Sequence, residues 1–488
     1  MLFNSFEFAV FFPAVALLHF LLPFRARWVL LLLASLGFYM AWRVEYVLLL
    51  LASTLIDYYA GRAMGRCATR RERRKYLFLS LAGNFGILFT FKYAGFFTRS
   101  WNGLASGVGW STQLPVLDLV LPVGISFYTF QALSYAIDVY RGTLRPETNP
   151  ARFILFVTYF PQLVAGPIER AGRLIPQLRQ PTTPEGARIA DGLRRMAFGL
   201  FKKVVIADRL SRAVDAVYSD PTRQGGPALA LATVFFAFQI YCDFSGYSDV
   251  AVGAARVMGI ELMENFRSPY LSRSMREFWQ RWHISLSTWF RDYVYQPLGG
   301  SRQGEARTVL NLAAVFLLSG LWHGANWTFV LWGAFHGGCL IASRLTAAVR
   351  GHALARTRAE RFPGLLAAGR TLFTFALVNL GWVLFRAHSL SDALEVYRGL
   401  SRGWGSLFAA GGPTVLAASF AVTGPELALS ALFVLLLILV ERGSGELHPM
   451  SLLARQGRAV RWPCYYALLL ALLVFGIFDD SPFIYFQF

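Results

Sequence analysis

Long apolar runs, separated by short basic connections, extend over nearly the whole of this 488-residue chain. Residues of the set AVILMFWYC make up 55% of it and charged residues only 15%, whereas soluble domains contain roughly 25% charged residues. A membrane-crossing helix needs about 20 predominantly apolar residues. We therefore expect an all-α, polytopic integral membrane protein with roughly ten or more transmembrane helices, forming a single membrane domain over residues 1–488.

The positive charge of the chain lies mainly in the connections between the apolar runs. Lys and Arg outnumber Asp and Glu by 47 to 28, a balance that in other proteins suggests nucleic-acid binding. Here the cations occupy short loops, the pattern of cytoplasmic loops in membrane proteins. We expect no nucleic-acid partner, and we place the arginine-rich segment 62–75 in the cytoplasm and segment 98–112 on the opposite side.

Two segments differ from an ordinary membrane crossing. The apolar run 153–165 is short and ends at Gly166-Pro167, so we expect it to enter and leave the membrane on one side. Segment 276–295 combines an aromatic face at helical spacing with charged residues on its other faces. This pattern is typical of a helix that lies at the membrane interface.

Three of the seven histidines are candidates for chemistry: His283 in the interface segment, His323 in GLWHGANW and His336 in WGAFHG. His323 ends an apolar run and is followed by Gly324 and Asn326, which are poor helix-interior residues, so we expect the helix to break there. A titratable group at membrane depth is costly and marks a candidate functional site. A catalytic base and a buried imidazole bonded to a carbonyl both fit His323, and the break leaves open whether His323 and His336 face each other.

Polar residues also gather in segment 241–249, which contains Asp243 and Asp249. Their carboxylates could bind a metal, but their spacing matches no calcium loop. Hydrogen bonding that stabilises a break between the apolar runs 228–241 and 247–260 fits the pattern better. The four cysteines show no paired spacing, so we expect neither a disulfide framework nor a metal site.

A series of further motifs follows in order along the chain. They are LPVGISFYTFQ at 121–131, FPQLVAGPI at 160–168, YCDFSGYSD at 241–249, FRSPY at 266–270, FWQRWHISLS at 278–287, WHG at 322–324 and FIYFQF at 483–488. In this combination the chain resembles the membrane-bound O-acyltransferase (MBOAT) superfamily, and within it the bacterial alginate O-acetyltransferase branch. The resemblance implies the MBOAT fold, with transmembrane helices, re-entrant segments and interface helices around a central tunnel.

The resemblance also implies roles for individual residues. His323, in the Trp-His-Gly position, corresponds to the catalytic histidine of the family, and His336 is a secondary candidate. We expect His323 to remove the proton of the acceptor hydroxyl, because an imidazole with a pKa of about 6.5 suits that task at neutral pH. The candidates for substrate binding or the tunnel are Trp322, Asn326, His283, Arg281, Gln239 and Asp243.

The substrates and partners expected from the resemblance are as follows. Acetyl-CoA is the donor, used as a substrate with no bound cofactor, and cytoplasmic arginines suit its phosphates. The acceptor is an exopolysaccharide such as alginate, reached through an extracytoplasmic partner of the SGNH-hydrolase type. The chain would lie in the lipids of the bacterial cytoplasmic (inner) membrane.

Two alternatives remain open at this point. The first is a D-alanyl or lipid/fatty-acyl transferase of the same fold, which pocket size would distinguish. The second is a transporter or flippase, which inverted repeats of broken helices would favour. No such repeats are visible in the sequence, and the Trp-His-Gly motif argues against a transporter.

Overall fold

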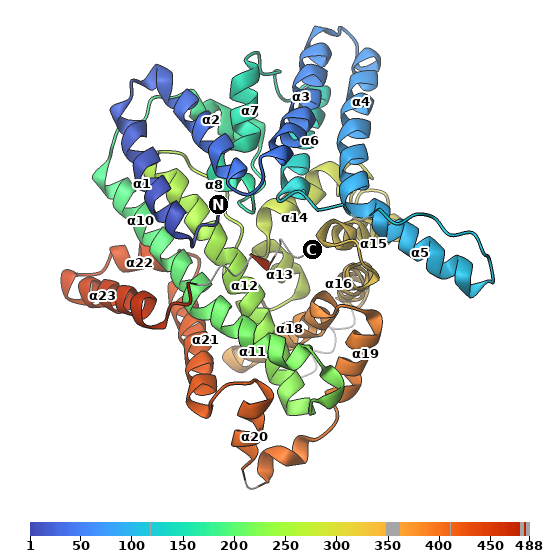
Figure 1. Cartoon of the computed structure of the whole chain (residues 1–488), viewed down its shortest axis with the longest axis vertical. Coiled ribbons are helices and arrows are strands. Elements are labelled where there is room, and N and C mark those ends of the chain that lie inside the picture. Colours follow the sequence, from blue (N-terminus) through green and yellow to red (C-terminus); the bar gives the residue numbers. More distant parts are fainter. Residues whose placement is uncertain (118, 348–361, 410, 479–482, 485–488) are drawn as a thin grey trace. The chain divides into compact units, whose positions relative to one another are not determined.

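The computed structural model describes residues 1–117, 119–347, 362–409, 411–478 and 483–484, and every regular element within these ranges is a helix (Figure 1). Seven helical stretches in them are long and apolar enough to cross a membrane. They are Glu45–Arg66, Arg70–Gly107, Gly226–Val257, Glu305–His323, Pro363–Arg386, Gly424–Ser444 and Arg458–Phe475. The all-α class predicted from the sequence is thereby confirmed, while the larger number of crossings and the tunnel stay predictions.

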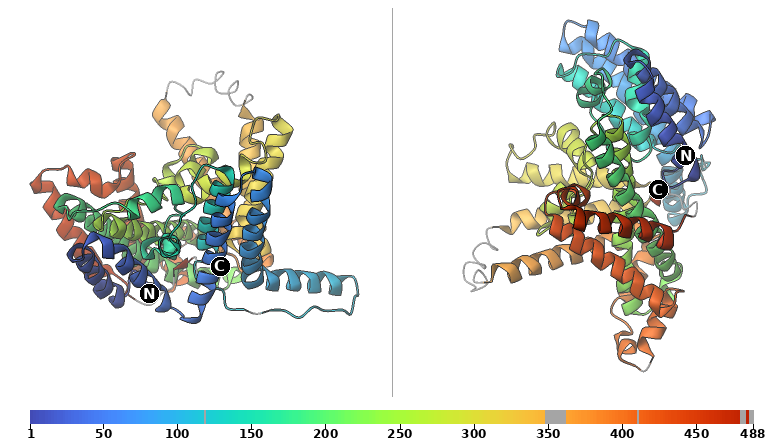
Figure 2. Two further views of the ribbon diagram at one scale, coloured as in Figure 1. Left: turned by 90° about the horizontal axis from the view of Figure 1, so that it is seen from above. Right: turned by 90° about the vertical axis from the view of Figure 1, so that its left-hand side faces the viewer.

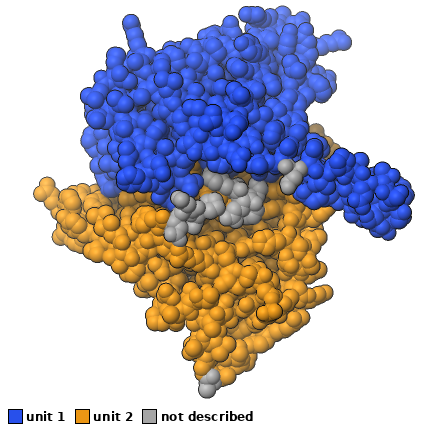
Figure 3. Space-filling model, in the orientation of Figure 1, with its two compact units in different colours: residues 1–196, 248–263, 485–488 blue, residues 197–247, 264–484 orange. Residues whose placement is uncertain are grey.

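The chain divides into two compact units (Figure 3). The single membrane domain expected from the sequence stays a prediction. Unit 1 comprises residues 1–196, 248–263 and 485–488, and unit 2 comprises 197–247 and 264–484. The helices α10 (Gly186–Leu200) and α12 (Gly226–Val257) contribute residues to both.

Unit 1 contains the N-terminal helices. They are α1 (Phe6–Leu21), α2 (Phe24–Met40), α3 (Glu45–Arg66), α4 (Arg70–Leu88), η1 (Phe89–Tyr93), α5 (Ala94–Gly107), α6 (Ile125–Arg141), α7 (Pro150–Thr158), α8 (Phe160–Leu163) and α9 (Ala171–Leu178).

Unit 2 contains the remaining helices of the described residues. They are η2 (Phe201–Ala207), α11 (Asp208–Tyr218), η3 (Pro221–Arg223), η4 (Pro269–Leu271), α13 (Met275–Arg281), α14 (Ile284–Phe290), η5 (Arg291–Tyr295), α15 (Glu305–His323), α16 (Trp327–Leu345), α18 (Pro363–Arg386), α19 (Leu390–Gly399), η7 (Trp404–Phe408), α20 (Gly412–Ser419), α21 (Gly424–Ser444), α22 (Pro449–Ala454) and α23 (Arg458–Phe475).

The continuous helical stretch from α4 to α5 bends at the π-helix η1. Its 38 residues correspond to about 57 Å of helix, well beyond the roughly 30 Å of a bilayer core. After the bend, α5 turns away from α4 (Figure 2). It exposes Phe97, Trp101 and Leu104 along one face, as helices at the membrane interface do.

The short apolar run 153–165 forms α7 and α8, of nine and four residues. The Oδ1 atom of Asn149 accepts hydrogen bonds from the backbone N–H groups of Ala151 and Arg152 and caps α7. Neither helix is long enough to cross a membrane, and their apolar side chains are buried. The re-entrant path stays a prediction.

The break predicted within segment 241–249 is wrong, because α12 runs without interruption through it. Two of the polar residues there have partners on a neighbouring helix instead: Lys203 Nζ lies 2.8 Å from Asp243 Oδ1, and Lys202 Nζ donates to Ser245 Oγ. Gly246 lets α12 approach the chain at Gly199 closely. The polar side chains here form hydrogen bonds and ion pairs with neighbouring helices, so α12 does not have to unwind to satisfy them.

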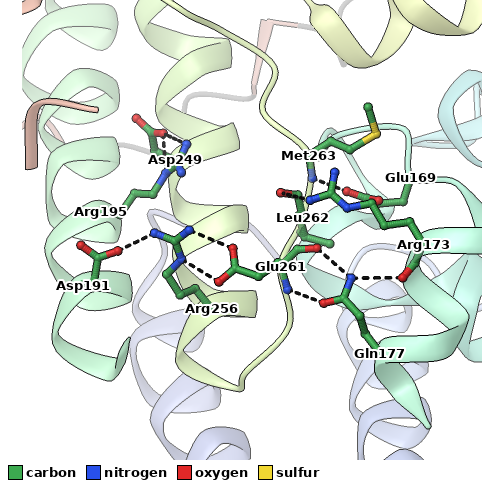
Figure 4. A network of polar contacts seen from close by, with 10 residues as sticks. All are labelled: Glu169, Arg173, Gln177, Asp191, Arg195, Asp249, Arg256, Glu261, Leu262 and Met263. Carbon is green, nitrogen blue, oxygen red and sulfur yellow. Dashed lines mark hydrogen bonds and ion pairs between the residues drawn. The ribbon is translucent and has the colours of Figure 1, made fainter. Parts of the chain in front are cut away.

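A polar network in unit 1 fixes the segment that follows α12 (Figure 4). The guanidinium of Arg256 pairs with Asp191 and, at 2.8 Å, with Glu261. The side-chain amide of Gln177 on α9 bonds both the N–H and the C=O of Glu261. Beyond it, Glu169 accepts a hydrogen bond from the N–H of Met263. Side chains around α9 thus hold the backbone of 261–263 in place.

We expect Glu169 to make stability depend on pH. Burial raises the pKa of this carboxyl to about 7, and the N–H of Met263 offsets only part of that rise. Because the folded pKa lies above the unfolded one, the contribution of Glu169 is full below about pH 4.5 and is lost as the pH rises through about 7. The loss is on the order of 3 kcal/mol.

Thermal unfolding of the detergent-purified protein between pH 5 and pH 8 measures this effect. Glu169→Gln keeps an oxygen acceptor for Met263 but cannot ionise, so its melting temperature should fall less across the same range. Equal pH dependence in both proteins would contradict the assignment.

Candidate active site

The helix α15 ends at His323, as the sequence predicted from the glycine that follows. Gly324 adopts an extended conformation, and a methyl group there would overlap the ring of Phe329. Asn326 then caps α16, with its Oδ1 accepting from the N–H of Thr328. The imidazole of His323 is only 3% exposed, so the helix end presents it to the interior of unit 2.

Two glycines set the close approach of α15 and α16. A methyl group on Gly320 would overlap the carbonyl oxygen of Phe329, and one on Gly333 would overlap that of Phe316. Backbone-to-backbone contact of this kind is typical of membrane helix pairs, in which small residues lie at the interface. The crossing places the end of α15 beside the first two turns of α16.

Aromatic rings surround His323. The centre of its ring lies 5.0 Å from that of Trp322, 4.9 Å from Trp332 and 5.3 Å from Phe385. The ring centre of His283 is 6.4 Å away. Three separate stretches, from the turn before α14, from α15–α16 and from α18, therefore meet at this histidine.

His283 reaches the cluster because the predicted interface helix over 276–295 is interrupted. The chain forms α13 and α14, and His283 between them has φ = 43°, in the left-handed region. The N–H of Ile284 donates to the carbonyl of Asn265, which stabilises the turn. Burial lowers the pKa of His283 to about 3, so its ring is neutral at physiological pH.

His336 on α16 lies in a second, adjoining group of rings. It is fully buried, with its ring centre 4.8 Å from Trp332 and 5.1 Å from Trp279. A methyl group on Gly381 of α18 would come within 2.5 Å of its Nε2 atom. Trp332 therefore lies against both His323 and His336.

Of the other four residues predicted for the site, three have structural partners. Asn326 Nδ2 donates to the carbonyl of His388, and Arg281 pairs with Glu277 and Glu446. Asp243 is held by Lys203 and accepts from the N–H of Ile484, while Gln239 is buried one turn earlier on α12. The structure thus brings together Trp322, His323, His283 and His336 and leaves the other four outside the ring cluster.

A cavity of about 860 Å³ opens beside the cluster. Trp279, which contacts the ring of His336, forms part of its wall, together with Phe316 and Ser319 of α15. Three arginines, Arg276, Arg291 and Arg344, also line it. The cavity therefore joins basic side chains to the aromatic surroundings of the histidines.

Three residues of the ring cluster were not predicted from the sequence: Trp332, Trp279 and Phe385. Nothing in the sequence separates Trp332 from the other twelve tryptophans, since its position depends on the glycine crossing of α15 and α16. The motif FWQRWH did single out the segment of Trp279, though without a role for this residue.

Comparison with known proteins shows which family the chain belongs to. The family model described as "MBOAT, membrane-bound O-acyltransferase family" matches residues 144–374. The "Probable alginate O-acetylase AlgI" of Azotobacter vinelandii is 40% identical over 391 residues, which cover 80% of this chain and 75% of that relative. The "Peptidoglycan O-acetyltransferase" of Helicobacter pylori is 37% identical over 71% of this chain and 68% of its own length.

A more distant relative has a different printed activity. The "Teichoic acid D-alanyltransferase" of Streptococcus thermophilus is 32% identical over 44% of this chain and 55% of its own length. Since the relatives with identities near 40% are matched over more than two thirds of their length, the chain belongs to the membrane-bound O-acyltransferase family and is a multi-pass membrane enzyme that transfers acyl groups to oxygen.

Proposed function

We propose that this O-acyltransferase moves an acetyl group from acetyl-CoA to a hydroxyl group of a polysaccharide across the bacterial cytoplasmic membrane. The observation that carries the proposal is the position of His323, buried at the end of a membrane helix among aromatic rings. Trp279 and Trp332 connect these rings to a cavity lined by arginines. The names of the O-acetylating relatives support acetyl as the group transferred.

The cavity suits both the charged part and the apolar part of the donor. Coenzyme A carries phosphates, for which arginine side chains are good partners, and its long pantetheine arm can reach a buried site. Arg344 is paired with Glu305 and Arg291 with Asp292, whereas Arg276 forms no ion pair with the residues that the structure describes. Arg276 is thus the cation best placed to bind a phosphate.

His323 supplies the acid–base chemistry in this proposal. As the acceptor oxygen forms a bond to the thioester carbon, its proton moves to the imidazole, and the C–S bond then breaks. The imidazolium returns the proton to the departing thiolate, so the enzyme ends unchanged. A site walled by aromatic rings excludes water, which would otherwise compete with the acceptor.

The acceptor in this proposal is a polysaccharide outside the cytoplasmic membrane. An extracytoplasmic partner of the SGNH-hydrolase type would carry the acetyl group onward to the polysaccharide. Alginate and peptidoglycan are the acceptors that the names of the relatives contain.

We expect Arg276→Ala to raise the KM for acetyl-CoA by about 3- to 10-fold, with kcat nearly unchanged, because a charged hydrogen bond to an exposed phosphate contributes modestly. Steady-state rates in detergent or nanodiscs give both constants. The matched control is Arg273→Ala, a neighbouring exposed arginine outside the cavity wall.

Acetyl-pantetheine, which lacks the nucleotide phosphates, makes this test specific. Its KM should be the same in the wild type and in Arg276→Ala. A rise in the KM for both donors would show that Arg276 acts on the fold and not on the phosphates.

The choice of donor tests the proposed function itself. Purified protein should consume labelled acetyl-CoA in preference to palmitoyl-CoA or a D-alanyl carrier protein. Preference for palmitoyl-CoA would instead identify a lipid acyltransferase, and preference for the D-alanyl carrier a D-alanyltransferase.

A further inference from the structure

The indole N–H of Trp332 is a buried hydrogen-bond donor that the fold leaves unsatisfied. The side chain is fully buried, and within the described part of the chain no acceptor lies within hydrogen-bonding distance of its Nε1 atom. Buried donors in native proteins nearly always have a partner, so an exception calls for an explanation. A group that forms during catalysis is one such explanation.

Trp332 differs from two other buried tryptophans nearby, Trp382 and Trp282. The N–H of Trp382 donates to the hydroxyl of Tyr270 at 3.1 Å and is satisfied. Trp282, whose N–H is unsatisfied among the described residues, packs against Phe266 and Trp382. Trp332 lies edge-to-face against His323 and also contacts His336, so of these donors it is the one beside the proposed base.

We propose that the Nε1–H of Trp332 donates a hydrogen bond to the oxyanion that forms on the acyl group, and that Trp332 is therefore a second catalytic residue. The inference rests on the proposed function, in which His323 is the base. A preorganised donor that acquires its acceptor only in the transition state stabilises that state selectively, because the ground state gains nothing from it.

The acyl transfer then proceeds through a tetrahedral oxyanion. The acceptor oxygen bonds to the carbonyl carbon and gives its proton to His323, while the π electrons of the carbonyl move onto its oxygen. The resulting oxyanion accepts the hydrogen bond from Trp332. Its electrons then re-form the C=O bond, the C–S bond breaks, and the thiolate takes the proton from the imidazolium.

The variant that tests this most cleanly is Trp332→benzothienylalanine, in which sulfur replaces the N–H with little change of shape. We expect kcat to fall by about 10²-fold, the effect of removing one oxyanion donor, with the KM for acetyl-CoA unchanged. Trp332→Phe should give at least as large a loss, and Trp382→benzothienylalanine, which removes a satisfied N–H with little change of packing, should stay within about threefold of the wild type.

A donor with a C=S group in place of the thioester C=O separates a catalytic from a structural role. The sulfur anion accepts hydrogen bonds weakly, so the 10²-fold penalty of losing the N–H should shrink several-fold with this donor. An unchanged penalty, or a wild-type kcat in Trp332→benzothienylalanine with acetyl-CoA, would overturn the inference.

The role of His323 in the proposed function and the role of Trp332 can be refuted independently of each other. Wild-type turnover by His323→Ala would refute the role of His323, whatever Trp332 does. An inactive His323→Ala protein together with a fully active Trp332→benzothienylalanine protein would refute only the inference about Trp332.

Discussion

His323→Ala is expected to lower the rate of acetyl transfer by about 10²–10⁴-fold, the contribution of a general base. The loss should appear in kcat, because the arginines that line the cavity for the donor are untouched. Labelled acetyl-CoA and purified protein in nanodiscs measure the rate. Since His323 is 3% exposed and surrounded by rings, thermal unfolding of the variant must accompany the rate to separate a chemical loss from a folding loss.

A second histidine provides the matched control. His388 is exposed and lies close in the fold, where its carbonyl accepts from Asn326. His388→Ala keeps that carbonyl and should transfer acetyl at the wild-type rate. A well-folded His323→Ala protein as active as His388→Ala would mean that another group takes the proton.

Gly333→Ala is expected to abolish most activity because it disturbs the packing of α15 against α16, not because it removes a reacting group. Its methyl group would overlap the carbonyl oxygen of Phe316, and backbone cannot move aside as a side chain can. Overpacking of this kind costs about 1–3 kcal/mol or more. It would also shift His323 on α15 relative to Trp332 on α16, and a displacement of about 1 Å can cost 10²-fold in rate.

Gly338→Ala on the same helix serves as the control for that variant. A methyl group there meets no atom within 4 Å, and alanine favours helix by up to about 1 kcal/mol. Its melting temperature should therefore equal or exceed that of the wild type. Similar loss of stability in both variants would show that the helix tolerates alanine poorly everywhere, and that the crossing has no special role.

The sequence predicted well the features that depend on local physical rules. Apolar runs of crossing length predicted the helices, and the pairing of a membrane-depth histidine with glycine predicted the end of α15 at His323. These patterns are informative because a charged or polar group is costly to place in lipid and therefore occurs at few positions.

Features that depend on contacts between distant segments were not predicted. Segment 241–249 looked like a helix break, yet Lys202 and Lys203 supply partners for its polar groups and α12 continues. Segment 276–295 had the periodicity of one helix, but His283 takes a left-handed conformation and turns the chain. The role of Trp332 depends on the same kind of contact, since the glycine crossing alone brings it to His323.

Sealed vesicles with the protein in one orientation test whether the acetyl group crosses the membrane. Acetyl-CoA is added on the arginine-rich side, and the acceptor polysaccharide, with any partner it needs, is held on the other. Ester-linked label should appear on the acceptor with the wild type and be lost with His323→Ala. Label that appears only when donor and acceptor share one side would contradict transfer across the membrane.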